Sequence, residues 1–483
     1  MSVNDFTTLL PFIIITGWAC ILLLVDLFVP RERKSITASL AALGLIVTLV
    51  VVVFLVGEER EAFDGMIILD GFSGYLQVLF IAAGLIAIAQ AYDYLKQQGI
   101  NRGEYYILLL FAVGGMILMT MAGDLIIVFL AIELLSIPLY ILSGFARPQF
   151  SSEEAGLKYF LLGAFASSFI VYGIALVYGS VDVTLLRDIV AITEAGEANL
   201  GLLIGGAVFI LIGLGFKVAV TPFHMWTPDV YQGAPSSVTS FMSVAAKTAG
   251  FAAIFRVFIS AFPSLSGYMV PAIIVIAAIT VIWGNVAALI QDNIKRMLAY
   301  SSIAHAGFIL MALPAAQDPE LASSAVSAAL FYLVAYAVSN LGAWGVVLAV
   351  ERTEGKGLEI DDYAGLGTRR PLLAIAMAVF MISLIGVPPT AGFMAKFSVF
   401  GVVLDAGLIW LAVVGVIASL ISAYFYLRVI VVMYMKTGEP RIRSEGWLNS
   451  TVWLAAIGTI LIGILPGPLL ALAEHANLLT WFP

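Results

Sequence analysis

The 483-residue sequence has little charge and almost no cysteine. Only 11% of its residues are charged, against about 25% in an average soluble domain, whereas 62% are hydrophobic. A soluble fold could not bury so much apolar surface, so we expect lipid to surround most of the chain. The single Cys20 excludes an internal disulfide and an all-cysteine metal or iron–sulfur site. The sequence contains neither of the glycine-rich nucleotide-binding motifs, G-x-G-x-x-G and G-x-x-x-x-G-K-[ST]. The composition also excludes most soluble enzymes, disordered scaffolds and nucleic-acid-binding proteins.

Apolar segments long enough to cross a bilayer follow one another along the sequence. Charged residues, Pro and Gly divide the chain into about fourteen such segments. They are 7–29, 35–57, 70–95, 104–122, 124–145, 155–179, 199–221, 236–262, 268–290, 295–313, 323–350, 371–403 (interrupted), 406–436 and 448–473. No basic residue precedes the first segment and no small-residue cleavage site follows it, so we interpret it as a retained span. The pattern predicts an all-α polytopic membrane protein.

The basic residues alternate between the connections of these segments. If the N-terminus lies outside, the inner connections hold sixteen Lys and Arg residues, Arg441 and Arg443 included, and the outer connections hold only Arg60 and Arg187. Basic residues concentrate on the cytoplasmic side of membrane proteins. We therefore expect a multi-pass protein of the cell inner membrane with both termini on the outer, periplasmic or extracellular, side.

Six charged residues within the apolar segments are candidates for function, because a charge at the bilayer centre costs on the order of 3 kcal/mol. They are Glu133, Lys217, Lys247, Arg256, Lys396 and Arg428. Arg256 and Arg428 lie near segment ends, where we expect anchoring or ion pairing. The other four lie deeper and point to an interior path for ions.

Glu133 follows Asp124 by nine residues, which places it about 13 Å along a helix. It is a candidate proton carrier, and the alternative is a structural ion pair. Lys217 lies between glycines and Pro222, where we expect a broken helix of the kind that marks ion pathways in transporters. The alternative for Lys217 is a side chain that extends to the inner surface.

Lys247 lies near the middle of its segment, so a side chain that extends to the membrane surface is least credible there. His305 is surrounded by small residues and titrates in the range that suits proton relay, although a lone buried histidine is often only a hydrogen-bonding residue. His224 beside the Pro222 break has a capping role or a relay role. Three scattered histidines make a metal site improbable.

Lys396 follows the Pro388–Pro389 pair by a few residues, so the Lys217 pattern of a broken helix with one lysine occurs twice. This echo predicts two inverted five-helix repeats in which spans 7 and 12 are broken. The expected organisation is 1–103 for the first three helices, 104–262 for the first repeat, 263–437 for the second and 438–483 for the last helix.

The region Gly103–Gly179 resembles the antiporter-like subunit N family of respiratory complex I. The resemblance continues through the blocks FKVAVTPFHMWTPDVYQGAPSSVTSFMSVAAKTAGF, MLAYSSIAHAGFIL, GVPPTAGFMAKF and SAYFYLRVIVVMY. It covers nearly the whole chain, and the TPDVYQGAP and EAGLKYFLLGAFAS blocks are typical of subunit N rather than of subunits L and M. The Pro388–Pro389 pair and Ser143 depart from the family pattern but do not touch the charged positions.

The resemblance implies a proton-pumping membrane-arm subunit of NADH:quinone oxidoreductase. NADH, FMN, the iron–sulfur clusters and the quinone would then belong to other subunits, and no cofactor to this chain. Its neighbours would be the antiporter-like subunit M and the small subunits K and J. The family's functional residues correspond to Glu133, Lys217, Lys247 and Lys396, with His305 bridging.

A mechanism follows as a hypothesis. Glu133 and Lys217 form an ion pair, its separation frees a proton, and the proton passes through Lys247 and His305 to Lys396 and the outer face. Three alternatives remain at this point. The chain could belong to a multisubunit cation/proton antiporter, to a ferredoxin-dependent relative of complex I, or to a membrane scaffold whose buried charges only hold helices together.

Overall fold

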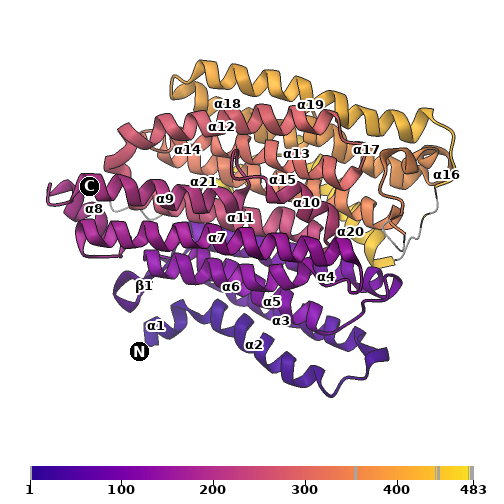
Figure 1. Ribbon diagram of the computed structural model, residues 1–483, viewed down its shortest axis with the longest axis horizontal. Coiled ribbons are helices and arrows are strands. Elements are labelled where there is room, and N and C mark those ends of the chain that lie inside the picture. Colours follow the sequence, from indigo (N-terminus) through magenta and orange to yellow (C-terminus); the bar gives the residue numbers. More distant parts are fainter. Residues whose placement is uncertain (1–2, 353–355, 441, 443–445, 477, 479–483) are drawn as a thin grey trace.

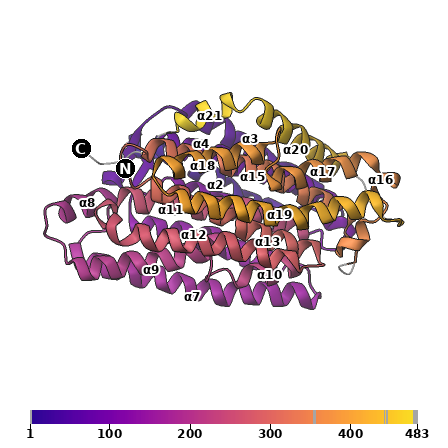
Figure 2. The ribbon, with the colours of Figure 1, turned by 90° about the horizontal axis from the view of Figure 1, so that it is seen from above.

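Nearly every described residue of the chain lies in a helix or in a turn between two helices. The computed structural model describes residues 3–352, 356–440, 442, 446–476 and 478. Its long helices lie side by side in an elongated bundle (Figures 1 and 2). The strands in the described part of the chain form one short antiparallel hairpin of β1 (Arg60–Ala62) and β2 (Ile67–Leu69). The all-α prediction is therefore confirmed for this part of the chain.

The first half of the bundle contains the helices α1 to α11. Their bounds are α1 Val3–Thr8, α2 Leu10–Asp26, α3 Ser35–Leu55, α4 Gly71–Gln97, α5 Glu104–Thr120, α6 Leu125–Ser143, α7 Phe150–Val181, α8 Leu186–Glu194, α9 Leu200–Val218, α10 Trp226–Gly233 and α11 Ser236–Ser260. The second half contains α12 to α21. Their bounds are α12 Ser266–Leu289, α13 Ile294–Leu310, α14 Ala312–Ala315, α15 Ala322–Val350, α16 Leu366–Arg369, α17 Pro371–Ile385, α18 Ala391–Asp405, α19 Ile409–Met435, α20 Gly446–Ile464 and α21 Gly467–Glu474.

Among the described residues, 11 helices are long and apolar enough to cross a membrane. The apolar helices α2, α5 and α17 are shorter. Every predicted apolar segment overlaps at least one of the observed helices. The protein is thus an all-helical, multi-pass membrane protein, and the larger number of spans stays an expectation.

Both breaks predicted from Gly and Pro are present. After α9, Ala219 adopts a left-handed conformation with φ 61°, and α10 begins only at Trp226. After α17, Gly386 has φ 91°, and α18 begins at Ala391. Each gap contains a cis X–Pro bond, Thr221–Pro222 in the first and Pro388–Pro389 in the second. Proline has no backbone N–H for a helical hydrogen bond, which explains why neither helix continues.

A third interruption was not predicted. The segment 448–473 was expected to form one helix, but α20 ends at Ile464 and α21 begins at Gly467. Pro466 lies between them and acts as the cap of the second helix. The reason is the same as at the other two breaks.

The interior of the bundle is formed by α11, α13 and α15. In their most apolar windows, 94%, 94% and 89% of the residues are buried within the chain, against 33% for α3 and for α7. Apolar side chains of the outer helices face outward, as expected where lipid replaces water. Polar residues on the central helices are therefore shielded from both lipid and water.

The helices nearest the two ends of the chain lie at the same end of the bundle. α1 and α21 both lie toward the end that carries α8 (Figures 1 and 2). An even number of crossings would produce this arrangement. Arg441, Arg443 and the terminal residues Met1 and Pro483 lie outside the described residues, so the predicted sidedness is not tested by their positions.

Candidate functional site

Lys217 lies in the last turn of α9, directly before the first break. Only 6% of the residue is exposed. Its Nζ donates hydrogen bonds to Ser136 Oγ at 2.7 Å and to Tyr140 Oη at 3.1 Å, both on α6. A Cβ atom at Gly250 of α11 would lie 3.3 Å from Lys217 Cβ, so this glycine makes room for the lysine stem. The side chain therefore points across the bundle and does not extend to the surface.

Glu133 of α6 is not paired with Lys217, although both residues are described. Its carboxylate accepts a hydrogen bond from Ser167 Oγ of α7. Ser136, which binds Lys217, lies one turn further along α6. The two charged residues therefore contact neighbouring turns of one helix, and the hypothesised ion pair is not formed in this structure.

Lys247 lies near the middle of α11 and is 2% exposed. Its Nζ donates to the backbone oxygen of Ser302 at 2.7 Å and to Ser302 Oγ at 2.5 Å. No carboxylate of the described chain forms an ion pair with it. A serine of α13 therefore holds this lysine in the buried interior of the bundle.

His305 lies one turn beyond Ser302 on α13 and hydrogen-bonds through both ring nitrogens. Nδ1 lies 2.7 Å from Tyr332 Oη of α15, and Nε2 lies 3.3 Å from Tyr426 Oη of α19. Tyr426 Oη also lies 2.5 Å from Ser301 Oγ. A hydroxyl donates and accepts at once, so the histidine stands within a continuous series of groups able to pass a proton.

Lys396 lies in α18, just after the second break, and reaches back to the helix before it. Its Nζ donates to the carbonyl oxygens of Leu384 at 3.2 Å and Ile385 at 2.7 Å, which end α17. The same Nζ lies 4.6 Å from the centre of the Phe308 ring of α13. The negative end of a helix dipole and an aromatic face both favour a cation. The break in the helix thus creates the binding position of the lysine.

The site residues form two groups. Ser302, His305 and Phe308 lie on successive turns of α13, so His305 belongs to this helix and Lys247 and Lys396 both contact it. Glu133 of α6 and Lys217 of α9, whose Nζ binds two residues of α6, form the second group. Among the described residues, no hydrogen bond joins the two groups. They meet where Gly250, one turn after Lys247, packs against Lys217.

His224 and the two prolines lie at the breaks. His224 occupies the turn before α10, its Nδ1 is buried without a hydrogen-bond partner, and its ring centre lies 6.2 Å from that of Trp283. No contact joins it to the lysines in the described residues. Pro222 and Pro388 belong to the cis bonds already noted and contribute backbone geometry.

The two arginines expected to pair do so. Arg256 of α11 forms a bidentate pair with Asp70 at 2.5 and 2.9 Å, with side-chain exposures of 0% and 1%. Arg428 of α19 pairs with Asp292 in the turn between α12 and α13. These cations have carboxylate partners, whereas Lys217, Lys247 and Lys396 have none within the described ranges.

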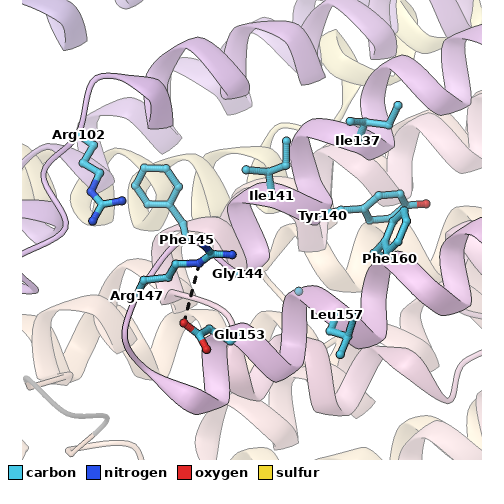
Figure 3. Close-up of a pocket in the computed structure, with 11 residues that line it drawn as sticks. Arg102, Ile137, Tyr140, Ile141, Gly144, Phe145, Arg147, Glu153, Leu157 and Phe160 are labelled. Atoms are coloured by element: carbon cyan, nitrogen blue, oxygen red, sulfur yellow. Dashed lines mark ion pairs between the residues drawn. The ribbon is translucent and has the colours of Figure 1, made fainter.

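A groove of about 820 Å³ opens on the outer side of α6 and α7. Its apolar walls include Tyr140 and Phe160, and Arg102 and Arg147 lie toward one end (Figure 3). Arg147 pairs with Glu153 at 3.9 Å. Tyr140 therefore lines this groove and also accepts a hydrogen bond from Lys217.

The hydroxyl partners of the charged residues were not predicted from the sequence. They are Ser136, Tyr140, Ser167, Ser301, Ser302, Tyr332 and Tyr426. One local signal was available, since Ser136 follows Glu133 by three residues in an otherwise apolar run. The described residues contain no group of three or more His, Cys, Asp or Glu side chains that could hold a metal ion.

Comparison with known proteins decides the family. Residues 122–422 match the family described as "NADH:quinone oxidoreductase/Mrp antiporter, TM". The NADH-quinone oxidoreductase subunit N of Chloroflexus aggregans is 48% identical over 98% of this chain and 97% of its own length. The chain belongs to the subunit N family of NADH-quinone oxidoreductase.

Further relatives agree with this assignment. Subunit N 2 of Roseiflexus castenholzii is 46% identical over 96% of this chain and 95% of its own. A chain of respiratory complex I from Thermus thermophilus superposes with a TM-score of 0.82 at 33% identity, covering 96% of this chain and 99% of that one. A chain of the Mrp complex from Dietzia shares the fold, with a TM-score of 0.86 at 21% identity over 99% and 97% of the two chains.

Membership in the subunit N family confirms the resemblance inferred from the motifs. The chain is an antiporter-like, proton-translocating membrane subunit of NADH:quinone oxidoreductase and part of the membrane arm of complex I. Subunits of this family carry no redox cofactor themselves. The remaining question is which residues move the protons.

Proposed function

We propose that Lys217, Lys247, His305 and Lys396 carry protons along the middle of the membrane. One observation carries the proposal. The three lysines are 2–6% exposed, and none of them forms an ion pair with a carboxylate of the described chain. A buried ammonium without a counter-charge is unfavourable, so such a lysine exchanges its proton more readily than one locked in an ion pair. Hydroxyl groups beside Lys217, Lys247 and His305 supply donors and acceptors for proton transfer.

Glu133 has a different role in this proposal. Its side chain is partly exposed on an outer stripe of α6 whose other members are about half exposed. These members are Ile126, Leu130, Ile137 and Ile141. A carboxylate facing lipid at mid-membrane costs on the order of 3 kcal/mol. We therefore propose that a neighbouring membrane-arm subunit covers this stripe and that Glu133 transmits charge changes between that subunit and Lys217. The family resemblance names subunits M, K and J as the neighbours.

The topology we propose has about fourteen spans and two inverted repeats, 104–262 and 263–437, between the flanking regions 1–103 and 438–483. Corresponding helices have corresponding neighbours, which supports the repeat. The third helix of each unit, α7 or α15, packs on both parts of a broken helix, α9/α10 or α17/α18. The first helix of each unit, α5 or α12, packs on the second and the fifth. Inner basic residues then set both termini outside.

NADH, FMN, iron–sulfur clusters and quinone belong to other subunits in this proposal, and electron transfer there drives the charge changes here. The antiporter and ferredoxin-dependent alternatives share the fold but are less well supported by relatives that are 48% and 46% identical to the chain. The scaffold alternative is tested by the variants below. Each proton moved outward works against about 2.3 kcal/mol per 100 mV.

The test uses the assembled complex in proteoliposomes, with Lys217→Met, Lys247→Met and Lys396→Met as variants. We expect each variant to assemble and to pump fewer protons per NADH oxidised. Arg369→Met, which removes an exposed cation paired with Glu439, serves as the control and should leave the ratio unchanged. Assembled lysine variants that pump normally would instead support the scaffold alternative.

A further inference from the structure

A stripe of polar residues runs along α11 from its first turn to Lys247. Ser236, Ser240, Ser243 and Lys247 are spaced by four, three and four residues, which places them on one face of a helix. All four are buried, with exposures of 0–2%. Three serines along one face of a helix whose most apolar window is 94% buried are not explained by apolar packing.

Two further helices contribute polar side chains to the same space. Ser240 Oγ donates to Gln90 Oε1 of α4 at 2.7 Å, and Asn340 Nδ2 of α15 donates to Ser243 Oγ at 2.7 Å. The amide of Gln90 also donates to the Leu341 carbonyl at 2.9 Å. α4, α11 and α15 pack against one another in pairs. Their facing polar residues therefore form a column, defined here as Tyr94, Gln90, Ser236, Ser240, Ser243, Asn340 and Glu351.

Glu351 stands at the end of this column opposite Lys247. It follows the last residue of α15 and is 7% exposed. Its Oε1 accepts a hydrogen bond from Tyr94 Oη at 3.3 Å, and Tyr94 Oη accepts one from the Ser236 backbone N–H at 3.1 Å. Lys295 of α13 and Tyr363 face Glu351 closely enough to interact with it electrostatically. Lys295 is itself held by the Ala234 carbonyl at 2.6 Å.

Several buried polar atoms of the column have no partner in the described part of the chain. They are Ser236 Oγ, Asn340 Oδ1 and Glu351 Oε2, and Trp344 Nε1, one turn after Asn340 on α15, is also unpartnered. An unpartnered buried polar atom costs about 1–3 kcal/mol, and proteins usually satisfy such atoms with ordered water. Unpartnered atoms at both ends of the column favour a hydrated path over a sealed structural network.

We propose that this column takes up protons from the aqueous face at which α15 ends, with Glu351 as the receiving group, and delivers them to Lys247. A proton from water forms an O–H bond on the Glu351 carboxylate. Hydroxyl groups and water then pass it on, each breaking one O–H bond as the next forms, until it forms an N–H bond on neutral Lys247. No electrons are exchanged. This inference rests on the proposed function of Lys247.

The experiment compares Glu351→Gln with Glu351→Asp in the assembled complex in proteoliposomes and measures protons pumped per NADH oxidised. Gln keeps the size and the acceptor for Tyr94 but cannot ionise, whereas Asp is shorter but keeps the carboxylate. A proton-receiving role predicts that Gln lowers the ratio as much as Lys247→Met does and that Asp retains most of it. A structural role predicts the opposite order, which would overturn the inference. Glu439→Gln, at an exposed carboxylate outside the column, is the matched control and should change nothing.

The outcomes separate the two proposals. If Lys247→Met lowers pumping but Glu351→Gln does not, the column is wrong and the proposed function stands. If Lys247→Met leaves pumping unchanged, the proposed function itself fails. Should Glu351→Gln prevent assembly, Asn340→Leu closes the column beside Ser243, to which Asn340 donates a hydrogen bond, without changing a charged residue. Normal pumping by assembled Asn340→Leu would then overturn the inference, and a loss equal to that of Lys247→Met would support it.

Discussion

The Arg256–Asp70 pair allows a prediction whose size follows from the geometry. The guanidinium donates to both carboxylate oxygens, at 2.5 and 2.9 Å, and to the Thr120 carbonyl at 2.6 Å. Arg256 is fully buried, and its guanidinium carbon lies 5.0 Å from the centre of the Phe72 ring. Water therefore cannot screen the pair. The Arg256 side chain also joins three helices, since Arg256 lies on α11, Asp70 caps α4 and Thr120 ends α5.

Arg256→Met should destabilise the chain by about 3–5 kcal/mol, because it removes the counter-charge from a buried carboxylate. The double variant Arg256→Met/Asp70→Asn should recover most of this loss, since replacing both charges of a buried pair is often close to neutral. Asn at position 70 still accepts the hydrogen bond that Ser73 N–H donates at 2.8 Å, so the N-cap of α4 is kept.

Both variants are measured by the free energy of unfolding of the purified chain in mixed micelles, titrated with a denaturing detergent. Protons pumped per NADH oxidised by the assembled complex provide the second reading, which the double variant should leave at the wild-type value. A loss below about 1 kcal/mol for Arg256→Met, which is typical of exposed pairs, would refute the argument from burial. A double variant that is stable but does not pump would assign this pair to the transport path.

Three further predictions concern packing, a hydrogen bond and pH. Gly250→Val should cost about 1–3 kcal/mol through overpacking and lower the pumping ratio, because its Cβ would lie 2.7 Å from Val218 Cγ1 and 3.3 Å from Lys217 Cβ. Tyr140→Phe removes the hydroxyl that accepts from the same lysine, so pumping should fall while assembly is unchanged. The Lys436 ammonium, hydrogen-bonded at 2.7 Å, lowers the pKa of the Asp361 carboxyl. The stabilisation that this pair gives the folded state is thus present above the unfolded-state pKa of about 3.9. It is lost as pH falls through the folded-state pKa of Asp361. Asp361→Asn should accordingly lower the free energy of unfolding at neutral pH and leave it unchanged at strongly acidic pH.

The sequence predicts local features of this fold well. The breaks beside Lys217 and Lys396 follow from Gly and Pro within apolar runs, because those residues act on their own helix. Pairing of Arg256 was also predicted, since an arginine near a span end seldom lies in lipid alone. The break at Pro466 used the same chemistry and was missed because the surrounding run is apolar throughout.

What could not be predicted depends on which helices become neighbours. His305 meets Tyr332 and Tyr426, which are 27 and 121 residues away in the chain, and no local pattern announces that contact. The hypothesised Glu133–Lys217 pair fails for the same reason. Both residues were correctly assigned to the interior of apolar segments, but their side chains meet Ser167 and Ser136 in the folded chain.

The buried cations of the bundle have two kinds of partner, and each kind suits a different role. Arg256 meets a carboxylate in bidentate geometry, which holds the guanidinium in one state and fixes α11 to α4. Lys247 and Lys396 meet serine and carbonyl oxygens instead. A carboxylate beside these lysines would trap their charge, because separating a buried ion pair is expensive. Neutral oxygens bind the ammonium and still let it lose a proton, so uncharged partners, the kind these two lysines have in the described part of the chain, are what a proton path requires.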